Sequence, residues 1–221
     1  MNKITFEDVY NNAELKTYIN KGNDLLGVLG YTDHSEAHTM NSGDQASDIL
    51  LKLGYSERTA ELARISGYIH DMGNMLSRVD HAQTGALMAF IILRELGMDH
   101  DELADVVSAV GNHDENAGMP INALSAALII ADKSDVRRSR VRNKDKSTFD
   151  IHDRVNYAVI NSALTVLPKL RQILLEVQID TAISSVMDFF EIFLTRMSMC
   201  KRAADFLSAQ FRLRVNNSDI I

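Results

Sequence analysis

Residues 63–74 read Ala-Arg-Ile-Ser-Gly-Tyr-Ile-His-Asp-Met-Gly-Asn, and the adjacent pair His70 and Asp71 is the most informative feature of this stretch. The pair follows apolar residues at helical spacing and precedes a glycine, so it stands at the end of a predicted helix. There an imidazole and a carboxylate can both turn toward one metal ion. A simpler explanation of the pair alone is that His70 caps the last carbonyls of its helix.

The segments around this stretch also have helical spacing, from about Phe6 to Arg142. Ser56 is the predicted N-cap of the helix that leads to His70. Pro120 is typical of a first helical turn and predicts a helix that continues to Asp132. The chain has only two prolines, which allows long helices. The sequence predicts a mainly α fold, with a helical bundle over residues 1–150.

Residues 151–221 contain segments rich in β-branched residues and a segment of alternating apolar and polar residues. They predict a small α+β extension of order strand, strand, helix, strand. Val155–Leu167 and Leu170–Ile179 predict a hairpin that turns near Pro168, although the second segment fits a helix equally well. Residues 182–204 predict an amphipathic helix capped by Asp180, and residues 210–215 alternate as a strand does. The extension either covers the active-site mouth and selects substrate, or pairs two subunits in a homodimer.

Six side chains near helix ends or on helix faces form a candidate metal set: His38, His70, Asp71, His81, His113 and Asp132. The interval from the first to the second histidine is 32 residues, and the interval from the third to the fourth is the same. Hairpins of this length return the chain to the same end of a bundle, where bundle metal sites are built. Imidazole and carboxylate ligands without thiolate favour Mn, Fe, Ni, Co, Zn or Mg.

Six ligands fit two ions better than one. The first ion would be held by His38, His70, Asp71 and Asp132, and the second by His81 and His113 with Asp71 as a bridge. Two ions about 3.5–4 Å apart can hold a shared water as hydroxide and stabilise an in-line displacement. The predicted chemistry is phosphoester or phosphoanhydride hydrolysis, with Asp71, His81 and His113 as the candidate catalytic residues.

The pattern His38, His70-Asp71 and Asp132 resembles the HD-domain superfamily of metal-dependent phosphohydrolases over roughly residues 30 to 140. The segments around His81 and His113 resemble the additional histidine motifs of its two-metal members. The resemblance implies a helical bundle with a binuclear site and leaves the substrate open. Two departures are Asn74, where many members have lysine, and His113-Asp114, where cyclic-dinucleotide hydrolases have paired histidines.

Candidate substrate-binding residues are His34, Lys133, Asp135, Arg137 and Arg140. Arg140 lies eight positions after Asp132, which would return it to the same helix face. Guanidinium groups there would suit bidentate capture of phosphate. The alternatives are a surface histidine at position 34 and a solvated or oligomer-contacting arginine cluster.

Composition limits the partners. The chain of 221 residues has a net charge of −7, although residues 133–146 carry a local balance of +5. This predicts a local anion site for a small phosphorylated substrate such as a nucleotide, and no general affinity for nucleic acid.

The single cysteine, the N-terminus without a secretory signal, and the absence of a long apolar stretch predict a cytoplasmic protein without a membrane segment. Two other functions stay open, a catalytically silent nucleotide-sensing module and a di-iron oxygenase.

Overall fold

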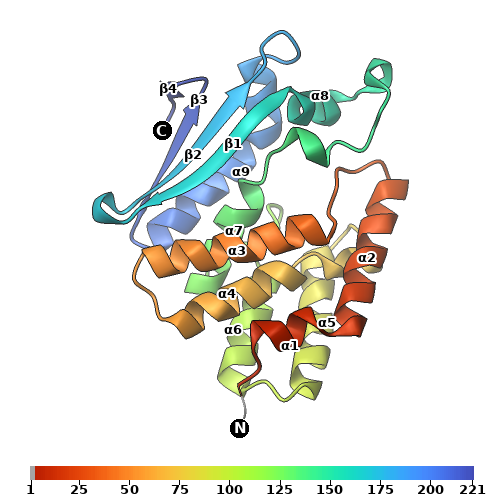
Figure 1. Cartoon of the computed structure of the whole chain (residues 1–221), viewed down its shortest axis with the longest axis vertical. Helices are drawn as coiled ribbons and strands as arrows, with labels where there is room; N and C mark the ends of the chain where they lie inside the picture. Colours follow the sequence, from red (N-terminus) through yellow and green to blue (C-terminus); the bar gives the residue numbers. More distant parts are fainter. Residues whose placement is uncertain (1–2) are drawn as a thin grey trace.

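The computed structural model describes residues 3–221, with a helical bundle at one end and a small sheet at the other (Figure 1). The predicted mainly α fold with a C-terminal α+β extension is confirmed. The helices of the bundle are α1 (Phe6–Tyr10), α2 (Ala13–Val28), α3 (Glu36–Lys52), α4 (Glu57–Ile69), α5 (His81–Glu95), α6 (His100–Gly111) and α7 (Ala123–Lys133). In the part of the chain that the structure describes, no helix is both long enough and apolar enough to span a bilayer.

Local capping fixes where the site-bearing helices begin. The Ser56 side chain accepts a hydrogen bond from the Thr59 amide and starts α4, as predicted. Helix α7 begins at Ala123 and not at Pro120, which is a correction. Asn122 and Ser125 form a capping box that satisfies the first amide groups, so the helix starts after the proline segment.

Two glycines let α3 and α4 approach closely. A Cβ atom added to Gly67 would lie 2.5 Å from the Cα of Gly43, so any side chain there would force the helices apart. Helix α3 carries His38 and α4 ends at His70. This glycine contact therefore sets the separation of two candidate metal ligands.

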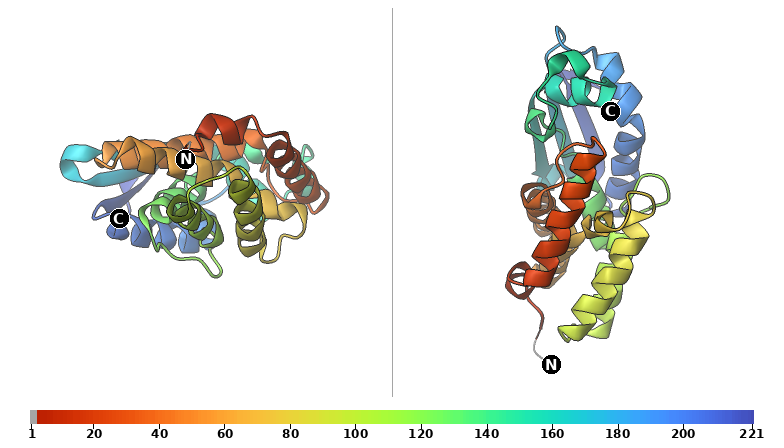
Figure 2. Two further views of the ribbon diagram at one scale, coloured as in Figure 1. Left: turned by 90° about the horizontal axis from the view of Figure 1, so that it is seen from below. Right: turned by 90° about the vertical axis from the view of Figure 1, so that its right-hand side faces the viewer.

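The extension contains α8 (Ile151–Ala158), β1 (Val159–Leu167), β2 (Gln172–Ile179), α9 (Val186–Phe206), β3 (Gln210–Val215) and β4 (Ser218–Asp219). The strands are adjacent in numerical order. β1 and β2 are antiparallel, β2 and β3 are parallel across α9, and β3 and β4 are antiparallel. Helix α9 runs along one face of this sheet (Figure 2).

Two predicted boundaries in the extension are wrong. Residues 155–158 are helical because Asp150 accepts a hydrogen bond from the Asp153 amide and nucleates α8. Helix α9 begins at Val186, since Ser185 and Asp188 form a capping box there, and Asp180 belongs to a preceding turn. The hairpin with its turn after Pro168 and the strand over residues 210–215 are confirmed.

A single apolar core runs through the bundle and the extension. Alternate residues of β2 and β3 point into it, as expected for a sheet covered on one face. Helix α9 also packs against α7, which carries Asp132. The extension is thereby packed against a helix of the candidate site, while the predicted division at residue 150 stays a prediction.

Candidate metal centre

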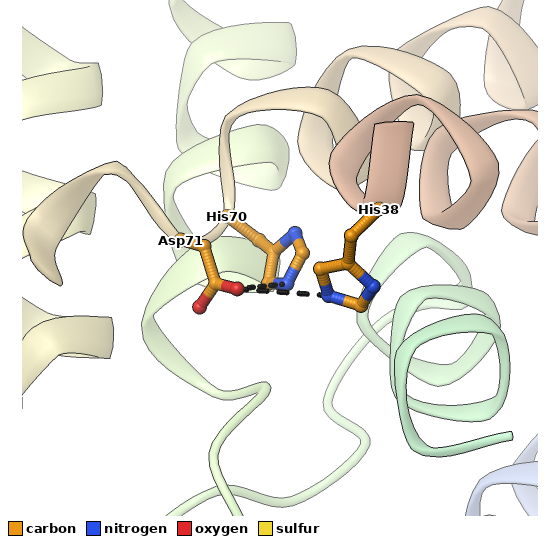
Figure 3. A group of neighbouring side chains, drawn as sticks. All are labelled: His38, His70 and Asp71. Carbon is orange, nitrogen blue, oxygen red and sulfur yellow. Dashed lines mark ion pairs between the residues drawn. The ribbon is translucent and has the colours of Figure 1, made fainter. Parts of the chain in front are cut away.

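The first cluster of candidate ligands joins α3, the end of α4 and the end of α7. His38 Nε2 lies 3.3 Å from Asp132 Oδ1 and 3.6 Å from Asp71 Oδ2. His70 Nε2 lies 3.2 Å from Asp71 Oδ2 and 3.6 Å from Asp132 Oδ1. Figure 3 shows the two imidazoles and the Asp71 carboxylate turned toward one another. Candidate ligands as far apart in the sequence as His38 and Asp132 thus meet within coordination reach.

Hydrogen bonds on the far side of each ring set its orientation. The Nδ1 atom of His38 lies 2.6 Å from Asp135 Oδ2, and that of His70 lies 2.7 Å from the carbonyl oxygen of Gly67. Each Nδ1 donates to its partner, which leaves Nε2 facing the cluster.

Both Nε2 atoms are buried without a hydrogen-bond partner. A buried polar atom without a partner is costly, and a metal ion at the centre would satisfy both atoms at once. The donor set therefore fits a divalent metal ion.

A second cluster lies on the other side of the Asp71 carboxylate. Asp71 Oδ1 is 3.6 Å from His81 Nε2 and 3.8 Å from His113 Nε2. The two imidazole Nε2 atoms are 3.2 Å apart. Nitrogen ligands about 2.0–2.1 Å from a tetrahedral ion are separated by about 3.3 Å, so this spacing also fits an ion. Because Asp71 turns one oxygen to each cluster, it is placed as a bridging group.

Burial and charge keep four of the six donors in the forms that bind metals. Burial, with the neighbouring charge of His70, holds the pKa of His113 well below its usual value, and burial also lowers that of His81. Burial works against ionisation of Asp71 and Asp132. The charges of His70 and Lys133 nevertheless keep both carboxyl pKa values well below the usual range.

The excess negative charge of the first cluster changes the pKa of His70. Burial alone would lower the pKa of its imidazole, but the two neighbouring carboxylates raise it to about 10. A divalent cation would neutralise the same pair of carboxylates. Electrostatics and geometry therefore point to a cation at the same place.

A cavity of about 330 Å³ opens above the two clusters. Asp71, His81, His113 and Asp132 line it on the side of the bundle. Its cationic lining residues are Arg78, Lys133, Arg140 and Arg196. A pocket with carboxylates and imidazoles on one side and cations around them suits an anionic ligand held against a metal.

The predicted substrate-binding residues divide into two groups. His34, Lys133 and Arg140 line the cavity, whereas Asp135 and Arg137 are not among its lining residues. Asp135 lies behind His38, and Arg137 pairs with it at 2.6 Å. Asp135 is therefore placed to orient the His38 ring, while the predicted substrate contact stays a prediction.

Arg140 reaches the cavity by a different route from the one predicted. Helix α7 ends at Lys133, and Arg140 belongs to a short 3-10 helix, η2 (Arg138–Arg140), so helical periodicity does not return it to Asp132. Its guanidinium donates to the carbonyl oxygens of Asp33 at 2.9 Å and Asp135 at 2.8 Å. Arg140 therefore ties the segment before His38 to the segment after Asp132.

The sequence did not indicate three residues of the site, namely two arginines that line the pocket and a glutamate that pairs with its cationic residues. Arg78 lies in the loop before α5, Arg196 lies on α9, and Glu115 follows His113. Glu115 pairs with Lys133 at 2.8 Å and Arg196 at 3.1 Å, and Lys133 pairs with Asp132 at 2.7 Å. An ion-pair chain thus runs from the extension to a candidate metal ligand. Only the short interval from Arg78 to His81 could have signalled any of these roles.

The fold and site define a helical-bundle protein whose histidines and aspartates could hold divalent metal ions. Residues 36–137 match the family model of the HD domain, in agreement with the resemblance seen in the sequence. The chain is also similar to an uncharacterized protein of Methanocaldococcus jannaschii, with 26% identity over 174 residues. That alignment covers 68% of this chain and 66% of the relative, just under two thirds of its length. No solved structure matches the chain significantly.

Proposed function

We propose that this protein is a metal-dependent phosphohydrolase that cleaves a phosphoester or phosphoanhydride bond of a small phosphorylated substrate. The observation that carries the proposal is the donor set around Asp71, in which four imidazole Nε2 atoms face its two carboxylate oxygens. Divalent ions held there would polarise the phosphoryl group and lower the pKa of a bound water.

The protein residues would hold the metal ligands in place and bind the phosphate. Asp71 would bridge the two clusters. Asp135 fixes the orientation of the His38 ring through its 2.6 Å hydrogen bond. Arg78 and Arg196 lie on the cavity wall, where a bound phosphate would meet their guanidinium groups.

Lys133 is placed to act on Asp132. Its Nζ atom lies between Asp132 Oδ2 and Glu115 Oε2, and these carboxylates raise its pKa although burial opposes the charge. Lys133 therefore stays cationic and holds one oxygen of Asp132, leaving Oδ1 to face His38 and His70. This is a positioning role for a residue that the sequence assigned to substrate.

We further propose a nucleotide or a similarly small phosphate ester as the substrate. The cavity volume of about 330 Å³ suits a small molecule, and exposed Tyr31 at its edge offers a ring on which a base can stack. The net charge of −7 argues against nucleic acid. The single cysteine, Cys200, is buried and free, which agrees with a reducing compartment such as the cytoplasm.

The proposal is tested by counting metal ions in the purified protein and measuring phosphate release from an aryl phosphate and a nucleotide panel. Mn²⁺, Co²⁺, Ni²⁺ and Mg²⁺ are added in turn, and the assays are repeated with Asp71→Ala. Asp48→Ala is the matched control, because Asp48 lies on the exposed side of α3. Turnover should disappear in Asp71→Ala alone. Turnover that survives in Asp71→Ala would defeat the proposal, and metal binding without any turnover would favour a sensing module.

A further inference from the structure

The His81 and His113 rings face each other through atoms that both carry lone pairs. The Nδ1 atom of His81 lies 3.1 Å from the carbonyl oxygen of Arg78, and that of His113 lies 2.6 Å from the carbonyl oxygen of Val110. Each Nδ1 must donate to its carbonyl, so each Nε2 is an acceptor in the neutral ring. Two acceptors 3.2 Å apart need a cation or a donor beside them.

Arg78 supplies that donor. Its Nη1 atom lies 3.3 Å from His81 Nε2 and 3.3 Å from Asn74 Oδ1. The amide of Asn74 in turn donates to Asp71 Oδ1 at 3.0 Å. The guanidinium is therefore connected to both sides of the second cluster, directly to His81 and through Asn74 to the oxygen that Asp71 turns toward His81 and His113.

An imidazole nitrogen has one lone pair and can serve one partner. A metal ion about 2.1 Å from His81 Nε2 would use the lone pair that now accepts from Arg78. It would also bring a second positive charge close to the guanidinium, which is unfavourable in a partly buried site. Arg78 and a second ion cannot both bind His81.

The Arg78 side chain also borders the cavity, which offers its guanidinium a second position. Its side chain is half-buried, lines the cavity, and has its Cζ atom 5.6 Å from the centre of the Tyr31 ring. A short rotation would take the guanidinium off His81 and toward an anion in the cavity. A phosphate group there offers the bidentate acceptor that arginine prefers.

We infer that Arg78 gates the second metal position: it occupies His81 in the free protein and releases it when a phosphate-bearing ligand draws the guanidinium into the cavity. The inference rests on the proposed function for the identity of the ligand. The hydrogen bonds of Arg78 go to Asn74 and His81 and not to His38 or His70, so an ion in the first cluster would not have to displace Arg78. The protein thus holds one ion at rest and acquires the second together with its substrate.

The test counts Mn²⁺ ions without any turnover. Mn²⁺ binding to the full-length protein is titrated by calorimetry and by electron paramagnetic resonance, with and without inorganic phosphate, for wild type, Arg78→Met and Arg94→Met. Arg94 is the matched control. It lies over the ring of Phe90 in the last turn of α5, at the opposite end of that helix from His81, and does not line the cavity. Thermal unfolding verifies that each variant is folded.

Wild type and Arg94→Met should bind one ion tightly and a second at least about tenfold more weakly, and phosphate should tighten the second. Arg78→Met should bind two ions tightly without phosphate and show the spectrum of a coupled Mn²⁺ pair. Equal second-site affinity in wild type and Arg78→Met, or loss of the second ion in Arg78→Met, would overturn the inference. Because no substrate is cleaved here, a gated second ion together with an absence of phosphatase activity would refute the proposed function alone.

Discussion

Substituting Gly67 with alanine should loosen the crossing that holds the metal centre together. The added Cβ atom would lie 2.5 Å from Gly43 Cα, 2.6 Å from Gly43 N and 2.9 Å from the carbonyl carbon of Ser42. All three are backbone atoms, so no side chain can rotate away. Ordinary carbon contacts are about 3.5–4.0 Å, and α3 and α4 must therefore separate by about 1 Å.

The energetic cost follows from this overlap. Overpacking in a well-packed region costs about 1–3 kcal/mol, and this backbone clash belongs at the upper end. Alanine recovers about 1 kcal/mol through its higher helix propensity. The net loss of about 2 kcal/mol corresponds to a fall in the melting temperature of about 4–8 °C for a domain of this size. Metal binding should weaken as well, because His38 and His70 lie on the two separated helices.

Calorimetry of unfolding and Mn²⁺ titration measure the two effects. Gly111→Ala is the matched control, since a Cβ atom there would meet Ala86 at an ordinary contact distance of 3.4 Å. That variant should unfold at the wild-type temperature or slightly above it. If Gly67→Ala melts together with Gly111→Ala and binds Mn²⁺ as wild type does, the close crossing of α3 and α4 does not set the site geometry.

Three further predictions concern buried groups. Burial raises the pKa of the Cys200 thiol to about 12, so the native protein should resist a thiol reagent that labels the unfolded chain, and rapid native labelling would contradict its placement. Glu115 has its pKa lowered from 4.5 to about 2, because Lys133 and Arg196 outweigh its burial. Its contribution, up to about 3 kcal/mol, is complete above pH 4.5 and is lost as the pH falls toward 2, so melting curves of Glu115→Gln should lack that acid-dependent loss. Asp135→Asn should weaken Mn²⁺ binding by about 10- to 100-fold in a titration, and unchanged affinity would exclude an orienting role.

The helical bundle could be predicted because its signals are local. Apolar spacing and the Ser56 cap lie within a few residues of the helix they define, and the structure agrees with them. Predictions failed where two local signals competed. Pro120 indicated a helix start, but the capping box of Asn122 and Ser125 satisfies more backbone groups and begins α7 three residues later.

The histidines and aspartates of the site could be found because their spacing repeats along the chain. Their partners could not, because only a short interval in the sequence connects Arg78 with His81, and nothing connects Arg196 with Glu115 as an ion pair. These contacts depend on the path of a loop and on the packing of α9 against the bundle. Arg140 illustrates the same limit, since a turn after α7, and not helical periodicity, brings it to the cavity.

The central claim is that the first cluster binds a divalent metal ion through His38, His70, Asp71 and Asp132. Crystals of the protein grown with Mn²⁺ and measured near the manganese absorption edge test it most directly. We expect an anomalous peak within about 2.0–2.4 Å of both Nε2 atoms and of the carboxylate oxygens Asp71 Oδ2 and Asp132 Oδ1. A structure in which Mn²⁺ binds elsewhere, with these four side chains in their present places and no peak between them, would contradict the account.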